Sequence, residues 1–138
     1  MATETTNYGL HQWDPEDSFL RTDFNEDFRK IDAAISEKLS AFSGTYVGTG
    51  VYGSTNPNHL TFPFHPQIVF LMEVGNGGLH SGYFLYGSPV GMINWAGSSM
   101  SNFNVQLAWT DNSVSWYSTV GAGEQLNFER TYHYLVIG

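Results

Sequence analysis

The chain has 138 residues, 13 acidic and five Lys or Arg residues, no cysteine, and a formal net charge of −8. This charge argues against nucleic-acid binding, because neutralising phosphates requires clustered basic side chains. Without cysteine the chain forms no disulfide and has no thiolate metal site or thiol nucleophile. The first residues lack the pattern of a signal peptide, and no apolar run spans a bilayer. We therefore expect synthesis in the cytoplasm and no membrane insertion.

The charges are distributed unevenly along the chain. Residues 1–42 carry nine acidic and four basic side chains, whereas residues 43–138 carry four acidic and one basic. A long segment with so few charges is solvated mainly by Ser, Thr, Asn, Gln, Gly and Tyr. The boundary predicts an N-terminal attachment segment with an oligomerising helix over residues 1–42, and a head domain over residues 43–138.

The N-terminal segment contains two helix start signals. Asp14 precedes a proline suited to the first helical position, and Asp23 is followed three residues later by Glu26. Apolar residues then recur at spacings of four, three and four residues, a pattern of two heptads formed by Phe24, Phe28, Ile31 and Ile35. We expect a helix over residues 23–39 with one apolar stripe.

An isolated helix of this length is marginal in water, so the stripe must pack against something. It either covers the protein's own β domain, as amphipathic helices usually do, or meets the same stripe in other copies as a short trimeric bundle. Two heptads alone do not decide between these alternatives.

The C-terminal part is typical of an antiparallel β-sandwich, which makes the predicted fold mainly β. Clusters of Gly, Asn and Ser separate short apolar or alternating runs. Strands are expected at residues 45–52, 60–64, 67–74, 82–86 and 131–137. The clearest hairpin covers residues 102–118, where a two-residue turn at positions 111 and 112 pairs Trp109 with Val114. The same register pairs Leu107 with Trp116, so both apolar sets share one face.

The expected strands at residues 67–74 and 131–137 are apolar on both faces, whereas an antiparallel sandwich strand usually keeps one face in water. Their second faces must therefore meet the helix or another subunit. The predicted oligomer interface consists of Phe24, Phe28, Ile31, Ile35, Val69, Leu71, Leu135 and Ile137.

The sequence contains no convincing catalytic site. There is no Gly-x-Ser-x-Gly elbow, and the five histidines lack metal-ligand spacing. Glu73 interrupts an apolar strand and is the one carboxylate that looks misplaced, but glycoside hydrolysis requires a pair. We expect no enzymatic activity, no cofactor and no metal, and we expect the histidines to be polar surface or interface residues.

Carbohydrate binding suits the head domain better. Aromatic rings stack on the apolar faces of sugars, and amides bind hydroxyl groups without charge. The candidate glycan-binding residues are Tyr83, Tyr86, Asn94, Trp95 and Tyr117.

Several segments resemble known structural proteins. Residues 6–13 (TNYGLHQW), 23–27 (DFNED) and 30–35 (KIDAAI) are similar to the start of tail-fibre-type proteins in phages and prophages of Gram-positive bacteria. Small β domains at the ends of such proteins resemble residues 44–48, 60–66, 114–117, 125–127 and 132–138. The resemblance covers most of the chain, although the long shaft of many fibres is missing.

This resemblance implies a virion protein made in the host cytoplasm. It would be a homotrimer that attaches to other tail proteins through its N-terminus and recognises host cell-wall carbohydrate with its β domain. A baseplate or capsid decoration protein without receptor binding would look similar, and a cell-wall glycan hydrolase is a more distant alternative.

Overall fold

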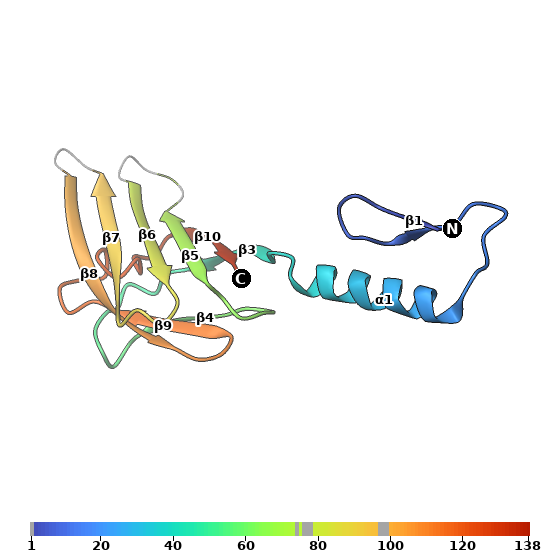
Figure 1. The fold of residues 1–138 in the computed structure, drawn as a ribbon. Coiled ribbons are helices and arrows are strands. Elements are labelled where there is room, and N and C mark those ends of the chain that lie inside the picture. The colour runs from blue at the N-terminus through green and yellow to red at the C-terminus, as the bar shows by residue number, and fades with distance from the viewer. Residues whose placement is uncertain (1, 74, 76–78, 97–99) are drawn as a thin grey trace. The chain divides into compact units, whose positions relative to one another are not determined.

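A computed structural model describes residues 2–73, 75, 79–96 and 100–138 (Figure 1). The chain forms two compact units, Met1–Leu39 and Ser40–Gly138. This division lies close to the charge boundary after residue 42.

The first unit is a small hairpin joined to one helix. Strands β1 (Thr3–Glu4) and β2 (His11–Gln12) pair antiparallel, and Gly9 adopts a positive φ of 60° in the turn between them. Helix α1 (Arg21–Ser36) follows. In the described part of the chain, no helix is long and apolar enough to cross a membrane.

The predicted helix is confirmed, but neither Asp14 nor Asp23 is its N-cap residue. Asp14 begins a turn, in which its carbonyl accepts a hydrogen bond from the Asp17 amide at 2.9 Å, so the predicted helix start at Asp14 is wrong. Leu20 is the N-cap residue and provides no side-chain cap, while Asp23 lies in the first turn, where its carboxylate faces the positive end of the helix dipole.

The second unit is one eight-stranded antiparallel sheet, curled into a half-barrel (Figure 1). Its order is β3-β10-β5-β6-β7-β8-β9-β4. The strands are β3 (Ala41–Val47), β4 (Asn58–Thr61), β5 (Ile68–Glu73), β6 (Leu79–Leu85), β7 (Val90–Ala96), β8 (Met100–Trp109), β9 (Ser113–Tyr117) and β10 (Thr131–Ile137). Each strand is bonded to the next from β3 to β4, so the two separate sheets of a sandwich are not confirmed.

The predicted hairpin is confirmed in its register. Trp109 lies opposite Val114 and Leu107 lies opposite Trp116. Strand β7 was not expected, because Pro89, Gly91 and Asn94 interrupt the apolar alternation that marks a strand.

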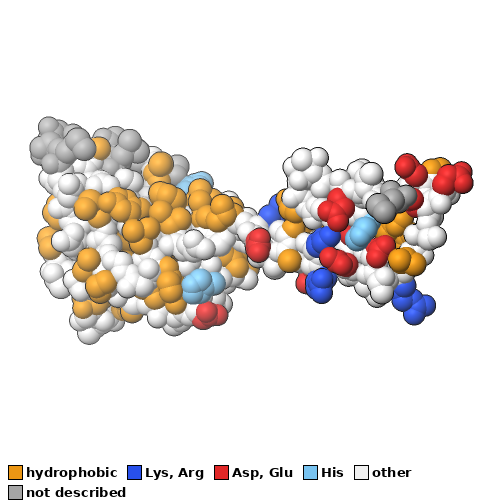
Figure 2. Space-filling model, in the orientation of Figure 1, with side chains coloured by type: hydrophobic (Ala, Val, Ile, Leu, Met, Phe, Trp, Pro, Cys, Tyr) orange, Lys and Arg blue, Asp and Glu red, His pale blue; other side chains and the backbone are white. Residues whose placement is uncertain are grey.

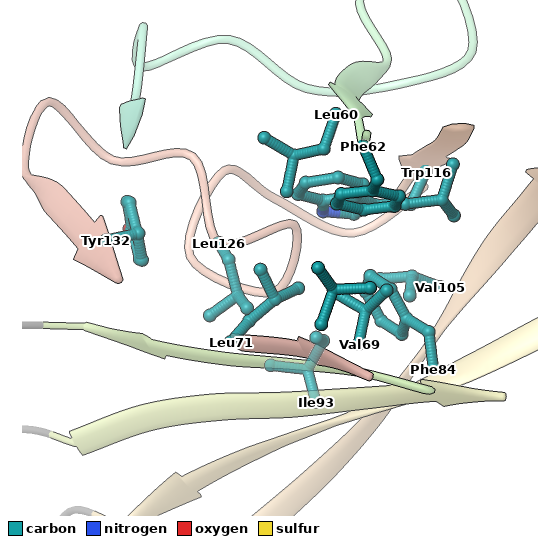
Figure 3. Packing of buried hydrophobic residues seen from close by; sticks show 12 residues of the cluster. Leu60, Phe62, Val69, Leu71, Phe84, Ile93, Val105, Trp116, Leu126 and Tyr132 are labelled. Atoms are coloured by element: carbon teal, nitrogen blue, oxygen red, sulfur yellow. The ribbon is translucent and has the colours of Figure 1, made fainter. Parts of the chain in front are cut away.

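The core fills the inside of the half-barrel. Side chains of β4 and β9 point toward those of β5, β6 and β8 (Figure 3). Leu126, from the segment between β9 and β10, is fully buried among them and adopts a φ of 57°. The buried hydrophobic residues are Leu60, Phe62, Val69, Leu71, Phe84, Ile93, Val105, Val114, Trp116, Leu126, Tyr132 and Val136.

A buried glutamine, Gln125, joins the loops that border the core. Its Oε1 accepts hydrogen bonds from the amides of Gly53 and Ser118, both at 2.9 Å. Its Nε2 donates to the Asn56 carbonyl at 2.8 Å and to Asn58 Oδ1 at 3.1 Å. One enclosed side chain therefore connects the loop before β4, the start of β4 and the end of β9.

Candidate functional site

The outer face of the sheet carries an apolar groove of about 760 Å³. The strand register places Leu135, Phe70, Tyr83 and Met92 in one row across β10, β5, β6 and β7. Leu135, Phe70 and Tyr83 are each about two-fifths exposed, so this row is open to a ligand or a protein partner. Figure 2 shows hydrophobic side chains gathered in a band across this part of the unit.

The same face carries no formal charge. Alternation along the eight strands assigns every second residue to it, and among the described positions none is Asp, Glu, Lys or Arg. Its polar residues are Ser, Thr, Asn, Gln, Tyr and His. Depletion of charge and enrichment in aromatic residues and Met distinguish the centre of a protein interface from ordinary surface.

The predicted interface residues of the sheet divide into two groups. Val69 and Leu71 are buried in the core, with 0% and 2% exposure, so their assignment to an oligomer interface is wrong. Their neighbours Phe70 and Met72 point outward instead, because successive side chains of a strand alternate between its faces. Leu135 is exposed on the outer face, and Ile137 on the same face is half-buried.

The predicted glycan-binding residues do not form one site. Tyr83 and Asn94 both line the outer groove. Tyr86 instead packs between the rings of His65 and Trp109, at centroid distances of 4.2 and 5.3 Å. The other two residues also lie apart, since Trp95 stacks on His80 and Tyr117 lies opposite Gln106 at the end of β9.

A second pocket, of about 360 Å³, has a lining of mixed polar and apolar side chains without Asp, Glu, Lys or Arg, which the sequence did not indicate. Asn127 lies in it, yet the amide is fully used: Oδ1 accepts from the Thr49 amide, and Nδ2 donates to Thr49 Oγ1 and to the Val51 carbonyl. These bonds fix the loop before β4 and leave Asn127 few free groups for a ligand. No local sequence signal brings the loop and Asn127 together, because they are far apart along the chain.

Glu73 is a structural ion-pair partner. Its carboxylate is fully enclosed and accepts hydrogen bonds from Arg130 Nη1 and His80 Nδ1. Burial, followed by the nearby Glu73 carboxylate, raises the pKa of Tyr132 to about 12. Arg130 also lies over the ring of Phe128, 5.1 Å from its centroid. Both carboxylate oxygens of Glu73 are thus engaged within the fold.

His80 is buried against Glu73, so the expectation of a surface or interface position is wrong for this histidine. The exposed His59 and His65 make isolated contacts. His59 contacts Ser115 and Thr61, and His65 contacts Asp111 at 3.1 Å. Among the residues that the structure describes, no three His, Asp or Glu side chains are grouped so that they could hold a metal ion.

In the first unit the apolar stripe of α1 is open. Phe24, Phe28, Ile31 and Ile35 are between 39% and 66% exposed, whereas Asp27 is the buried residue of the helix. The ring of Phe24 contacts Phe28 at 4.5 Å between centroids, so the stripe begins with a packed aromatic pair.

Asp27 holds the hairpin on the helix. Its carboxylate accepts hydrogen bonds from the His11 amide at 3.0 and 3.1 Å and from His11 Nδ1 at 2.8 Å. Lys30 Nζ donates to the carbonyl of Gly9. The hydrogen bond to Asp27 raises the pKa of His11, with a smaller contribution from Asp23. Burial alone would raise the pKa of Asp27, but the hydrogen bonds from His11 outweigh it and the pKa is lowered.

This pair predicts a pH range for hairpin docking. The contribution of His11 to the stability of hairpin docking on α1 is complete below the ordinary His pKa of 6.5. This contribution is lost as the pH rises through the raised pKa of His11. The contribution of Asp27 is complete above 3.8 and is lost as the pH falls through the lowered value. The ring of Trp13 stacks on His11, so the NMR signal of the Trp13 indole should report hairpin docking. We expect weaker docking at pH values above the raised pKa of His11. His11→Asn should remove that dependence; an unchanged titration would contradict the assignment.

Comparison with models of protein families, with curated proteins and with solved structures finds no match to this chain.

Proposed function

We propose that the chain is a structural protein of a phage-type virion, a homotrimer of the tail-fibre type. It binds bacterial surface carbohydrate with its second unit, Ser40–Gly138, called the β unit below. The observation that carries the proposal is the open stripe of α1. Its four large apolar residues are exposed, although an isolated helix of this length is marginal in water. Burying such residues between copies of the helix would stabilise it.

The residues of the stripe favour three copies. Spacings of four, three and four place Ile31 and Ile35 at successive d and a positions of a heptad. Ile at both positions favours trimers over dimers in parallel coiled coils. The hairpin is held at Asp27 and Lys30 and leaves the stripe accessible.

Phe28→Glu is expected to abolish association through the stripe, because it would bury a carboxylate in each copy of the bundle. Light scattering should give the wild type a mass of three chains or a multiple of three, and the variant should lose that multiple. The matched control is Arg29→Glu, at a helix position whose side chain is 78% exposed, which should keep the wild-type mass. A wild type of one-chain mass at micromolar concentration would contradict the proposal.

The carbohydrate part of the proposal is supported by the chemistry of the outer face. Tyr83 offers an aromatic ring beside Asn94 in a surface without formal charge. Rings of this kind stack on sugars, and neutral amides bind hydroxyl groups. Several copies in one assembly would strengthen weak single sites.

The second candidate function is a baseplate or capsid decoration protein without receptor binding. It is favoured by one feature of the outer groove, namely that its lining is mostly apolar and suits the side chains of another protein. Sedimentation with purified bacterial cell walls separates the two functions. Saturable binding supports the tail-fibre function, and its absence in a trimeric sample supports decoration.

A further inference from the structure

Strand β3 ends the sheet, so one of its edges has no neighbouring strand. On the other side, Ser40 and Gly138 exchange both backbone hydrogen bonds, at 2.7 and 2.9 Å, and the Gly48 amide donates to the Arg130 carbonyl at 2.9 Å. Mutually bonded pairs recur at every second residue of an antiparallel ladder. The even-numbered residues therefore bond to β10, and the odd-numbered residues 41–47 direct their backbone groups away from the sheet.

This free edge is exposed and unprotected. Most residues of β3 are exposed, and Gly44 and Tyr46 are half-buried. In the described part of the chain, no loop or side chain hydrogen-bonds to the backbone of the odd-numbered residues. The strand also contains no charged residue and no proline, which natural proteins place on edges to prevent pairing. Such an edge is a template for another strand.

The sequence of β3 is complementary to itself. With a two-fold axis at Gly44, residue 43 of one copy lies opposite residue 45 of the other, and residue 41 lies opposite residue 47. On the outer face this pairs Ser43 with Thr45, and on the inner face it pairs Phe42 with Tyr46. Hydroxyl and aromatic pairs of this kind stabilise neighbouring strands. A register shifted by two residues would instead set an aromatic ring against Gly44.

We propose that β3 pairs antiparallel with β3 of a second copy of this chain, about a two-fold axis at Gly44, so that one sheet continues through both molecules. The self-complementary pattern of β3 favours a second copy as the partner, and charge does not oppose it. The chain carries a net charge of −8, yet the strand and the outer face beside it are uncharged, so no like charges meet at this edge.

The pairing is independent of association through α1. A two-fold contact uses the same surface on both copies and closes after two. If both contacts form, β3 joins α1 assemblies in pairs. The Phe28→Glu background therefore isolates the β3 contact, because the stripe no longer contributes.

Thr45→Pro is the decisive substitution. The Thr45 amide faces the free edge, so proline removes no hydrogen bond within the sheet, and edge strands tolerate proline. In the Phe28→Glu background, light scattering should give a mass of two chains, which Thr45→Pro should halve. Thr45→Val keeps the amide and should remain dimeric. If Thr45→Pro does not fold, Thr45→Lys provides the same test by adding an edge charge.

Amide hydrogen exchange locates the contact. In the dimer the amides of Ala41, Ser43, Thr45 and Val47 should exchange slowly, and on dilution these four alone should accelerate. Three results would overturn the proposal: a one-chain mass for Phe28→Glu at micromolar concentration, a dimer that survives both Thr45→Pro and Thr45→Lys, or a monomer in which the four amides are already protected. The last result would mean that a segment of the same chain covers the edge. A wild type that never forms multiples of three would contradict the α1 trimer and leave this pairing standing.

Discussion

Arg130→Met is expected to lower the free energy of unfolding of the β unit by about 2–3 kcal/mol, because the buried Glu73 carboxylate loses its cationic partner, a guanidinium that is itself 42% exposed. Glu73 is the charge left behind, and its side chain has no exposure to solvent. The remaining hydrogen bond from His80 does not neutralise the carboxylate unless the imidazole is protonated. Urea denaturation followed by tryptophan fluorescence measures the loss.

Two variants make this measurement specific. Arg29 pairs with Glu26 on the surface at 4.0 Å, so Arg29→Met should change stability by less than about 0.5 kcal/mol. Glu73→Gln combined with Arg130→Met removes both charges and should recover part of the stability lost by Arg130→Met alone. If Arg130→Met lowers the free energy of unfolding no more than Arg29→Met does, the ion pair between Glu73 and Arg130 does not stabilise the β unit.

Gln125→Leu is the second large effect, with an expected loss of at least about 3 kcal/mol. An unsatisfied buried polar group costs about 1–3 kcal/mol. Leucine would leave four groups without this partner, two of them in buried bonds and two in half-buried bonds. These are the amides of Gly53 and Ser118, the Asn56 carbonyl and Asn58 Oδ1. Because the two side chains are of similar volume, the loss measures the hydrogen bonds rather than a cavity.

The matched control for Gln125→Leu is Gln106→Leu. Gln106 is exposed on the outer face of β8, and the expected change is within about 0.5 kcal/mol. Urea denaturation of both variants under the same conditions makes the comparison. Equal losses of unfolding free energy in the two variants would mean that water molecules replace the four hydrogen bonds of Gln125.

The hairpin over β8 and β9 could be predicted in detail from the sequence, because its information is local. Alternation marks both strands and the turn residues fix the register, as the pairing of Trp109 with Val114 confirms. The order of the eight strands in the sheet, by contrast, cannot be predicted from local sequence patterns. Short alternating runs are equally compatible with two stacked sheets and with one curled sheet, so the sandwich was predicted from a pattern that both share.

The wrong assignment of Val69 and Leu71 has a physical cause. When both faces of a strand are apolar, alternation does not identify the face that points inward. Glu73, the carboxylate that looks misplaced in the sequence, shares the buried face with these two residues. The carboxylate is buried by Arg130, whose position 57 residues later no local pattern reveals.

The outer groove could be predicted only in part. Tyr83 and Asn94 were identified as recognition residues from their chemistry, and the groove contains both. Phe70 joins them through the pairing of β5 with β6. The row of outer residues extends past the groove to Met92 through β7, a strand that the sequence did not predict. A row of residues that crosses several strands depends on how those strands pair, so it cannot be predicted before their registers are known.

The pairing of β10 with both β3 and β5 has a consequence for biosynthesis. Strands β5 to β9 follow one another as a meander and can form as they leave the ribosome, but β3 must wait for residues 131–137, which form the last strand of this sheet along the chain. Contacts between such distant segments form slowly, because the intervening chain must first be ordered. Until then both edges of β3 are unpaired, and this interval is when the nascent chain is most exposed to aggregation.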